Sequence, residues 1–412
     1  MFKVAGLSLF FRGITLVSKF LFAIFIARYL TLEELGVFGI FNVSITLSIL
    51  ILGFDFHSYS ARTLLQVPLE DRGAMVRDQF VFYLGSYIVF LPTLYLLFFF
   101  NAISTKYIIL FYAVLVFEHL SQEFYRLFII FSRPITSNII LFLRSGSWVY
   151  VIVSAWLLEW DFFYNIEVVF YAWLTGVSAS VLLSLILIRR LKFKPFRKTA
   201  IDTNYIRTGF FASLFFFAGT VAYRIVEFSD RYLLDYYLGK TEVGIYTFFA
   251  GMGNLVEIVV QVTVVMIFYP KLIESFSKDK DKYQQVFLSY KKQLVLVTGV
   301  TFIIMGVGIF PVVHYLDKPE FSNNLIVFFL LATSKIVFNF SLIYHTHLYI
   351  LKRDKAIMWT TCMAAIANIL LNLILIPLYG IAGAAWASLF SFTLILVLKY
   401  SVYKNMQKSS VV

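Results

Sequence analysis

Residues 34–38 read ELGVF, and residues 242–246 read EVGIY. The two stretches agree in character at every position, and Gly36 stands 208 residues before Gly244, close to half of the 412-residue chain. Each stretch follows an Arg-Tyr-Leu triplet, at 28–30 and at 231–233. Self-similarity at a fixed offset is typical of internal repeats. The sequence therefore predicts two related halves that share one order of elements.

The composition indicates that both halves lie in a membrane. Hydrophobic residues make up 60% of the chain, charged residues 14%, and the mean hydropathy is +0.84. Soluble domains are about 45–50% apolar and about 25% charged. A membrane span needs about 20 apolar residues, so the chain has enough for twelve. This composition excludes a cytosolic enzyme, a disordered chain and a receptor with a single anchor. The continuous apolar runs also differ from the alternating strands of an outer-membrane barrel.

The apolar windows form two sets of six, and each window is expected to be a transmembrane helix. The first set lies at 4–27, 36–58, 79–100, 107–130, 138–158 and 167–188. The second set lies at 208–232, 244–268, 293–313, 324–350, 357–378 and 381–400. Because six is even, both sets begin on the same side of the membrane, which favours parallel repeats about an axis along the membrane normal. The predicted fold class is all-α: a polytopic membrane protein with about 12 transmembrane helices in two six-helix lobes around a central cavity.

Lysine and arginine in the connections predict the orientation. With a cytoplasmic N-terminus, the connections on the inner side hold 24 basic residues and those on the outer side hold 4. Both termini are therefore predicted to be cytoplasmic. The connection 189–207 holds seven of these basic residues and is interpreted as a cytoplasmic linker between an N-terminal lobe, 1–188, and a C-terminal lobe, 208–412. Between membrane spans, such a basic run favours contact with anionic lipid over nucleic acid.

The repeated stretches and the end of the chain resemble a known family. Besides ELGVF and EVGIY, the resemblance rests on Asn368, Asn372 and the segment 376–385, IPLYGIAGAA. These stretches resemble polysaccharide transporters of the multidrug/oligosaccharidyl-lipid/polysaccharide (MOP) flippase superfamily, and within it the O-antigen flippases of the Wzx type. The resemblance covers the whole chain in length, number of spans and two-half layout.

The resemblance implies a function in polysaccharide biosynthesis. It implies a flippase that moves an undecaprenyl-diphosphate-linked oligosaccharide, such as an O-antigen repeat unit of lipopolysaccharide, from the cytoplasmic to the periplasmic leaflet of the bacterial inner membrane by alternating access. The implied partners are this lipid-linked oligosaccharide, membrane lipid, H+ or Na+ as a coupling ion, and other polysaccharide-assembly proteins.

No catalytic or cofactor-binding pattern accompanies the spans, so we expect neither an enzyme nor a cofactor. The sequence contains no phosphate-binding loop of the G-x-x-x-x-G-K-[ST] type. Cys362 and the five histidines have no spacing that suits a metal site. A drug or small-solute antiporter of the same superfamily remains an alternative, although a cavity for cationic drugs should be acidic or neutral. A membrane-bound saccharide polymerase is a weaker alternative, because the outer connections are short.

Seven basic residues fall inside the predicted spans, where each costs about 3 kcal/mol if it faces lipid. They are Arg12, Lys19, Arg126, Arg144, Arg224, Arg231 and Lys335. We expect them to face a hydrated cavity or a partner side chain. Arg12 and Lys19 are seven residues apart, share one helix face, and would attract a diphosphate. The predicted substrate-binding residues are Arg12, Lys19, Arg224, Arg231, Asn254 and Lys335.

Acidic side chains in the spans are candidates for coupling transport to an ion gradient, because a carboxyl group in a low-dielectric site can bind and release protons. The predicted ion-coupling residues are Asp55, Glu118, Glu123, Glu227 and Glu257. Structural pairing is the open alternative for several of them. Span seven reads Arg224, Glu227, Asp230, Arg231 at three- and four-residue spacings, and span four reads Glu118, Glu123, Arg126, with Arg144 on span five as a further partner.

Overall fold

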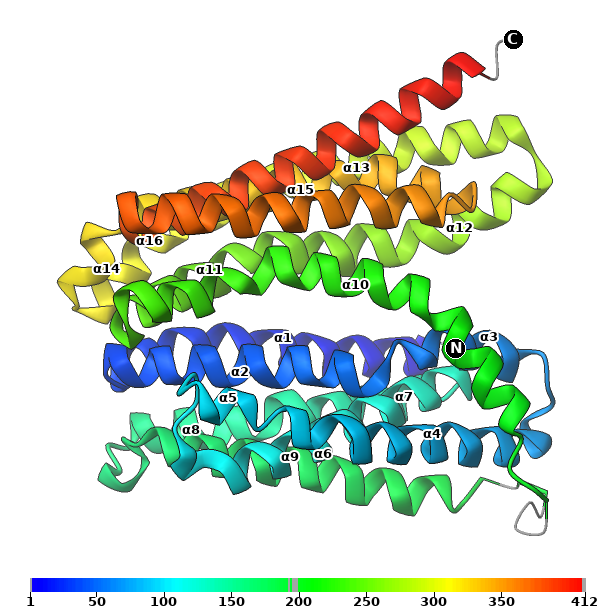
Figure 1. The fold of residues 1–412 in the computed structure, drawn as a ribbon, viewed down its shortest axis with the longest axis horizontal. Helices are drawn as coiled ribbons and strands as arrows, with labels where there is room; N and C mark the ends of the chain where they lie inside the picture. Colours follow the sequence, from blue (N-terminus) through cyan, green and yellow to red (C-terminus); the bar gives the residue numbers. More distant parts are fainter. Residues whose placement is uncertain (1, 192, 195–198, 410–412) are drawn as a thin grey trace. The chain divides into compact units, whose positions relative to one another are not determined.

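The fold is built from long helices that lie side by side within each half of the chain (Figure 1). The computed structural model describes residues 2–191, 193–194 and 199–409. Every regular element in these ranges is helical, which confirms the predicted all-α class. Within the predicted linker, Lys192 and residues 195–198 lie outside the described residues.

The six predicted spans of the N-terminal half all fall on helices. These are α1 (Phe2–Tyr29), α2 (Leu32–Gly53), α4 (Arg72–Thr93) followed by α5 (Leu96–Phe99), α6 (Ile108–Ile130), the continuous run of α7 (Pro134–Phe142), η3 (Leu143–Ser147) and α8 (Trp148–Leu157), and α9 (Ile166–Ile188). Shorter elements connect them: α3 (Phe56–Leu65), η1 (Leu69–Asp71), η2 (Thr105–Tyr107) and η4 (Asp161–Phe163).

The six spans of the C-terminal half are also helical. They lie on α10 (Thr203–Leu238), the run of α11 (Lys240–Val260), η5 (Gln261–Val265) and α12 (Met266–Lys278), α13 (Lys280–Leu316), α15 (Leu325–Ile350) and α16 (Asp354–Ser409), with the short α14 (Pro319–Asn323) between α13 and α15. The segment 269–292, which connects two predicted spans, is helical on both sides of Asp279. Asp279 caps α13 by accepting hydrogen bonds from two backbone N–H groups, of Asp281 and Lys282.

Eleven helical segments of the described chain are long and apolar enough to cross a membrane. The twelfth predicted span is found within α16, which is interrupted at Gly380 with φ of 61° and ψ of −140°. Only glycine adopts such a conformation without strain. A side chain at Gly383 would overlap the carbonyl of Leu375, so the two arms approach closely at this break. The predicted spans 357–378 and 381–400 therefore correspond to the two arms of α16.

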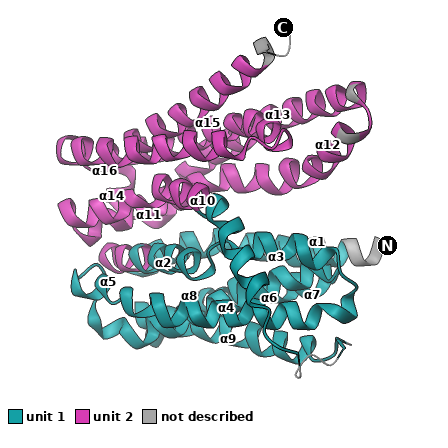
Figure 2. Cartoon of the chain, turned by 45° about the vertical axis from the view of Figure 1, so that its right-hand side comes forward, with its two compact units in different colours: residues 1–30, 40–217 teal, residues 31–39, 218–412 magenta. Residues whose placement is uncertain are grey.

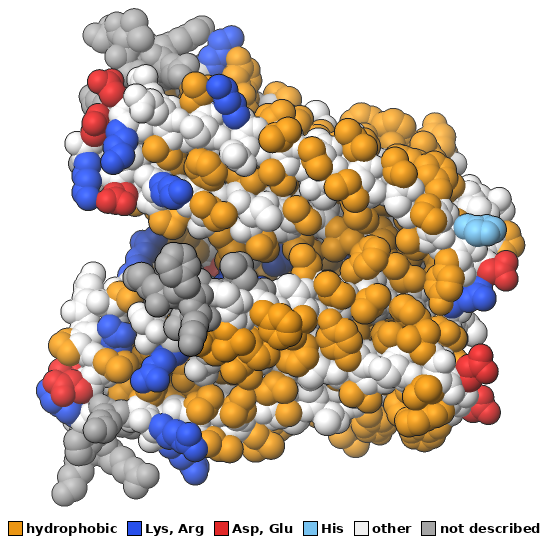
Figure 3. All heavy atoms as spheres, turned by 180° about the vertical axis from the view of Figure 1, so that it is seen from behind, with side chains coloured by type: hydrophobic (Ala, Val, Ile, Leu, Met, Phe, Trp, Pro, Cys, Tyr) orange, Lys and Arg blue, Asp and Glu red, His pale blue; other side chains and the backbone are white. Residues whose placement is uncertain are grey.

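The surface has the distribution of side chains that a bilayer requires. On the face drawn in Figure 3, hydrophobic side chains cover the middle of the chain's helices and charged side chains gather toward their ends. Large apolar side chains far from the core remain exposed, among them Ile88, Ile109 and Val307. In water such exposure would be costly, whereas lipid solvates it. The chain is therefore a multi-pass membrane protein.

Two compact units divide the chain (Figure 2). Unit 1 comprises Met1–Leu30 and Ile40–Phe217, and unit 2 comprises Thr31–Gly39 and Ala218–Val412. Helix α10 thus belongs to unit 1 in its first part and to unit 2 in its remainder. The lobe boundaries expected from the sequence, 1–188 and 208–412 with a linker between them, remain a prediction.

The glycines of the repeated motif contact each other inside unit 2. A side chain at Gly36 would overlap the backbone carbonyl of Lys240, and one at Gly244 would overlap that of Leu32. The first turns of α2 and α11 therefore cross with their backbones in contact, as small residues allow. This contact gives a physical reason for a glycine at both positions.

We expect Gly36→Leu to lower the apparent melting temperature, because a side chain has no room at this crossing and overpacking costs about 1–3 kcal/mol. Thermal unfolding of the purified protein in detergent measures the change. Gly85→Leu is the matched control, since nothing lies within 4 Å of a Cβ at Gly85. Equal melting temperatures for the two variants would contradict this account of the crossing.

Candidate functional site

The charged side chains of the spans gather in clusters within each unit. In unit 1, Arg12 on α1 donates through Nε to Oδ1 of Asn138 at 3.0 Å, and Asn138 donates to Ser8. Lys19, two turns further along α1, is exposed and interacts electrostatically with Arg144 and Glu118. The two cations proposed to share one face of the first span thus have different surroundings: Arg12 is held by an amide, and Lys19 lies beside another cation.

The Arg144 site consists of Lys19, Glu118, Arg144 and Trp173. Nε of Arg144 lies 3.3 Å from Oε1 of Glu118, and the two side chains are 15% and 13% exposed. The indole N–H of Trp173 donates to the other oxygen of Glu118 at 3.2 Å. Four elements of unit 1 supply these groups: α1, α6, η3 and α9. The pairing of Arg144 with a carboxylate of span four, which the sequence suggests, is observed with Glu118.

The carboxylate of Glu123 is fully buried in unit 1 and is the centre of the Glu123 network. Glu123 accepts a hydrogen bond of 2.6 Å from the hydroxyl of Tyr83 and one of 3.1 Å from the amide of Gln79, and it pairs with Arg126. Gln79 in turn accepts from the hydroxyl of Ser60 at 2.6 Å. Both oxygens of this carboxylate therefore accept hydrogen bonds from the protein, and a cation lies beside it, which offsets the cost of burying a charge.

Asp55 occupies a turn and not a helix interior. Helix α2 ends at Gly53, and Phe54 and Asp55 have positive φ of 48° and 50°. The predicted span 36–58 is therefore too long at its end, and α3 begins separately at Phe56. The carboxylate of Asp55 lies 3.9 Å from Nδ1 of His57.

The Lys335 cluster occupies unit 2 and joins α10, α11 and α15. The ammonium of Lys335 lies 2.8 Å from Oε2 of Glu257 and 3.5 Å from Oε1 of Glu227. Arg224 pairs with the other oxygen of Glu227 at 2.5 Å, and the hydroxyl of Tyr223 donates to Glu257 at 3.0 Å. The cluster alternates positive and negative groups, so each carboxylate has at least one cation beside it.

A second carboxylate group in unit 2 forms the Asp230 site. Asp230 accepts from the hydroxyl of Tyr246, lies 3.5 Å from the hydroxyl of Ser388, and pairs with Arg231 at 3.3 Å. Arg231 also donates to the backbone carbonyl of Glu227 at 2.9 Å. Both charged side chains are buried.

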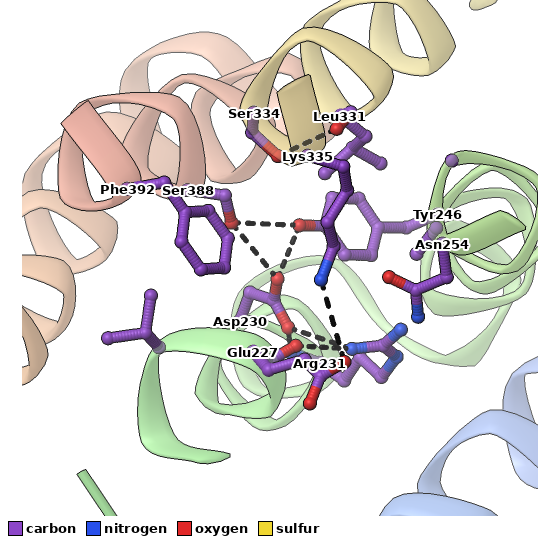
Figure 4. A pocket seen from close by; sticks show the side chains of 13 residues that line it. Glu227, Asp230, Arg231, Tyr246, Asn254, Leu331, Ser334, Lys335, Ser388 and Phe392 are labelled. Atoms are coloured by element: carbon purple, nitrogen blue, oxygen red, sulfur yellow. Dashed lines mark hydrogen bonds and ion pairs between the residues drawn. The ribbon is translucent and has the colours of Figure 1, made fainter. Parts of the chain in front are cut away.

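A small cavity separates the Asp230 site from the Lys335 cluster (Figure 4). Its lining includes Glu227, Asp230, Arg231, Asn254 and Lys335, and Figure 4 shows the amide of Asn254 directed into it. The space that a water centre can occupy is about 20 Å³, which suffices for one water molecule. In this conformation the cavity takes water or a small ion, and it is too small for a sugar.

The structure thus brings the predicted residues together in two separate sets. Arg224, Arg231, Asn254, Lys335, Glu227 and Glu257 lie in unit 2; Arg12, Lys19, Asp55, Glu118 and Glu123 lie in unit 1. The charges differ between the units. In unit 2, Arg224, Arg231 and Lys335 face an equal number of carboxylates. In unit 1, the four intramembrane cations, Arg12, Lys19, Arg126 and Arg144, outnumber the three carboxylates, Asp55, Glu118 and Glu123.

Several residues of these sites are not among the predicted ones. Tyr83, Gln79, Trp173, Tyr246 and Ser388 all supply hydrogen bonds to carboxylates. Their residue types are common in this chain, so no local pattern distinguishes them. Asp230 had a visible signal, because it stands beside Arg231 within the charged span seven.

No protein-family model and no curated protein sequence matches the chain. Solved structures do match. An inward-facing multidrug resistance MATE family transporter of the MOP superfamily has a TM-score of 0.73 and 12% sequence identity, with 96% of this chain and 95% of that chain covered. The lipid II flippase MurJ, in an inward closed conformation, has a TM-score of 0.65 and 16% identity, with 96% and 87% covered.

The chain has the fold of MOP superfamily transporters. A third structure with this fold is a MOP superfamily transporter from Pyrococcus furiosus, whose binding pocket is described as having reverse polarity that suggests a different function. Its TM-score is 0.62 at 13% identity, with 99% of this chain and 95% of that chain covered. At such identities the likeness establishes the MOP fold and leaves the substrate to be argued from the residues of this chain.

Proposed function

We propose that this chain is a flippase for a lipid-linked saccharide, an undecaprenyl-diphosphate-linked oligosaccharide such as an O-antigen repeat unit. It acts in the bacterial inner membrane with both termini in the cytoplasm, and it moves the head group outward by alternating access. The MOP fold supports a transport function. The observation that carries the choice of substrate is the excess of cations over carboxylates among the intramembrane residues of unit 1.

The excess of positive charge suits a phosphate-bearing head group. A bare cation at membrane depth is costly, so a fold that keeps more cations than acids there gains from an anionic ligand. Arg12 and Lys19 lie two turns apart on α1, a spacing of about 10 Å at 1.5 Å per residue. Successive contacts along this face would guide a diphosphate while the prenyl chain stays in lipid. In unit 2, Arg224, Arg231, Asn254 and Lys335 are proposed as contacts for the saccharide or its phosphates once the ion pairs open.

An ion gradient is proposed to drive or reset the cycle, with H+ or Na+ as the coupling ion. The candidate residues remain Asp55, Glu118, Glu123, Glu227 and Glu257. Asp55 differs from the others because the side chain that pairs with it is a histidine, His57, at 3.9 Å. Unlike lysine or arginine, a histidine can be neutral or charged, so uptake or release of a proton at this pair changes its electrostatics directly.

Deletion of the gene tests the proposed function. We expect the deletion strain to lose surface glycan and to accumulate undecaprenyl-diphosphate-linked repeat units that remain accessible only from the cytoplasmic side. Mass spectrometry of extracted lipids, combined with enzymatic labelling of sealed inverted vesicles, measures both quantities. Normal export in the deletion strain, with no trapped lipid-linked saccharide, would reject the proposal.

Arg12→Ala and Lys19→Ala are each expected to reduce surface-glycan output about tenfold or more, because each removes a charge-assisted contact with phosphate. Arg12→Lys should retain part of the output, since an ammonium keeps the charge without the guanidinium fork. Glycan is quantified at matched protein level in the membrane. Lys106→Ala is the control, because Lys106 is exposed and pairs with Glu167 in the first turn of α9. Wild-type levels of surface glycan in both Arg12→Ala and Lys19→Ala would contradict a role for these residues in binding the substrate.

A cationic-drug antiporter is the second candidate, favoured by the TM-score of 0.73 with the MATE family transporter. Efflux of a fluorescent cationic dye from everted vesicles separates the two functions. Our proposal predicts no gradient-dependent dye movement above that of vesicles lacking the protein, because the cation excess of unit 1 repels a positively charged solute.

A further inference from the structure

Arg144 has hydrogen-bonding capacity that the protein leaves unused. Its Nε and Nη1 are buried, and neither has a hydrogen-bond partner within the described structure. Glu118 lies near enough for an ion pair, at 3.3 Å from Nε, but not in hydrogen-bonding geometry. The ring of Tyr125 lies 6.0 Å from the guanidinium carbon. Unpaired buried donors on a charged group are costly, so their presence calls for an explanation.

The carboxylate of Glu118 is held by a different partner. Trp173 on α9 donates its indole N–H to Oε2 of Glu118 at 3.2 Å. Trp173 is itself fixed by stacking on Trp148, with ring centroids 6.2 Å apart. Glu118 is therefore anchored from the side of α9 and neutralises Arg144 through charge while leaving guanidinium N–H groups open.

The backbone around Arg144 is a π-helical segment whose carbonyl groups accept hydrogen bonds from nearby side chains. Arg144 lies in η3, a π-helical segment, and such segments are frequent at functional sites. The carbonyls freed by the wider turn are satisfied: Ser147 donates to Leu143 O at 2.9 Å, and the indole of Trp148 donates to Arg144 O at 3.0 Å. The guanidinium is thus displaced from regular helical register on a segment whose own polar groups are paired.

Lys19 makes the site accessible. It is exposed on α1, whereas Arg144 is 15% exposed, and the two cations share the single nearby carboxylate of Glu118. Arg126, another arginine in the spans of unit 1, differs because Glu123 accepts a hydrogen bond from it directly. Among these arginines, Arg144 combines unused donors with an exposed neighbouring cation.

We propose that Arg144 and Lys19 form the acceptor for a phosphate group of the substrate and that Glu118 holds the place of that phosphate while the site is empty. This inference rests on the proposed function and names the residues that take the head group. A phosphate presents several acceptor oxygens to a guanidinium fork, which one carboxylate oxygen at 3.3 Å does not satisfy. When phosphate binds, Glu118 moves away from Arg144 and remains with Trp173, so the two anions compete for one cation.

Binding of geranyl diphosphate to the full chain in phosphatidylcholine nanodiscs tests the proposal, with isothermal titration calorimetry as the readout. Arg144→Ala should weaken binding about tenfold or more. Glu118→Gln should tighten it about threefold or more, because the competing charge is gone. The double variant Arg144→Ala/Glu118→Gln does not leave the buried carboxylate of Glu118 without Arg144, so it keeps the test valid if Arg144→Ala alone fails to fold. Lys106→Ala is the control for the loss of one positive charge from unit 1.

A second readout follows the competition itself. Tryptophan fluorescence should change on titration with geranyl diphosphate, and Trp173→Phe should abolish most of that change while leaving the affinity within about threefold. Geraniol, which lacks the phosphates, should give neither heat nor a fluorescence change.

Unaltered affinity in the double variant, or weaker binding by Glu118→Gln, would overturn the site while leaving the flippase proposal intact. Absence of any binding by the wild-type chain would also overturn the site. The flippase proposal is judged separately, by the lipids that accumulate in the deletion strain.

Discussion

Replacing Lys335 by methionine is expected to lower the free energy of unfolding by about 3–5 kcal/mol, the usual cost of removing one partner from a buried ion pair. Lys335 is buried and lies between the carboxylates of Glu227 and Glu257, at 3.5 Å and 2.8 Å. Its ammonium also faces the rings of Phe338 and Phe392, with centroids 5.9 Å and 5.0 Å away. The substitution therefore also removes the attraction between the ammonium and these two rings.

The loss of stability should arise mainly from the carboxylate of Glu257, which loses Lys335 as its ion-pair partner. Glu227 keeps Arg224 as its partner after the substitution, whereas Glu257 keeps the hydroxyl of Tyr223. The double variant Lys335→Met/Glu257→Gln should therefore recover most of the stability, because it removes the uncompensated charge together with its partner. Denaturation by SDS in mixed micelles, followed by circular dichroism, measures the free energy of unfolding for all three proteins.

Lys399→Met provides the contrast. Lys399 is also buried in unit 2, and its ammonium lies 3.3 Å from Nδ1 of His345. Among the described residues no carboxylate forms an ion pair with Lys399, so the variant should lose less stability than Lys335→Met. Equal losses for the two lysines would mean that burial of the alkyl chain, and not the carboxylates, determines the cost.

The spans were predictable because they depend on local composition. A window of about 20 apolar residues is recognisable whatever its tertiary contacts, and each of the twelve windows lies mainly on helix. The end of α2 was not predictable. The apolar run continues past Gly53, but Phe54 and Asp55 adopt positive φ. Neither residue type favours that conformation strongly enough to be read from one sequence.

Ion pairs within one helix were predictable from the sequence, whereas an ion pair between helices, that of Lys335 with Glu257, was not. The pairs Arg224–Glu227 and Glu123–Arg126 follow from a three-residue spacing on one helix. The contact of Lys335 with Glu257 joins α15 to α11, and no spacing in the sequence indicates it. Such contacts depend on helix rotation and packing, which sequence periodicity constrains only by face.

The sequence also cannot predict that N–H groups of Arg144 lack a hydrogen-bond acceptor. They depend on the π-helical turn at Leu143–Ser147 and on the choice of Trp173 as the partner of Glu118. Composition indicates that a cation lies in the membrane, but it gives no measure of how completely that cation is paired. Only the positions of the surrounding helices decide this.

Glu123→Ala is expected to produce a second large loss of stability, about 4 kcal/mol or more, because it leaves several buried donors without an acceptor. Tyr83 and Gln79 are each 1% exposed, and both donate to Glu123. Arg126 loses its carboxylate at the same time. Glu123→Gln should lose less, since the amide oxygen still accepts from the hydroxyl of Tyr83.

The opposite substitution in the same pair should be milder, and the comparison tests why the network exists. Arg126→Met leaves Glu123 with the hydrogen bonds from Tyr83 and Gln79, and a buried carboxyl group can take up a proton and become neutral. The side chain of Arg126 is 27% exposed, so it has less burial to lose than Glu123, which is fully buried. SDS denaturation should therefore rank stability as wild type, then Arg126→Met, then Glu123→Ala. If Arg126→Met proved the more damaging change, the cation and not the shared acceptor would organise this part of unit 1.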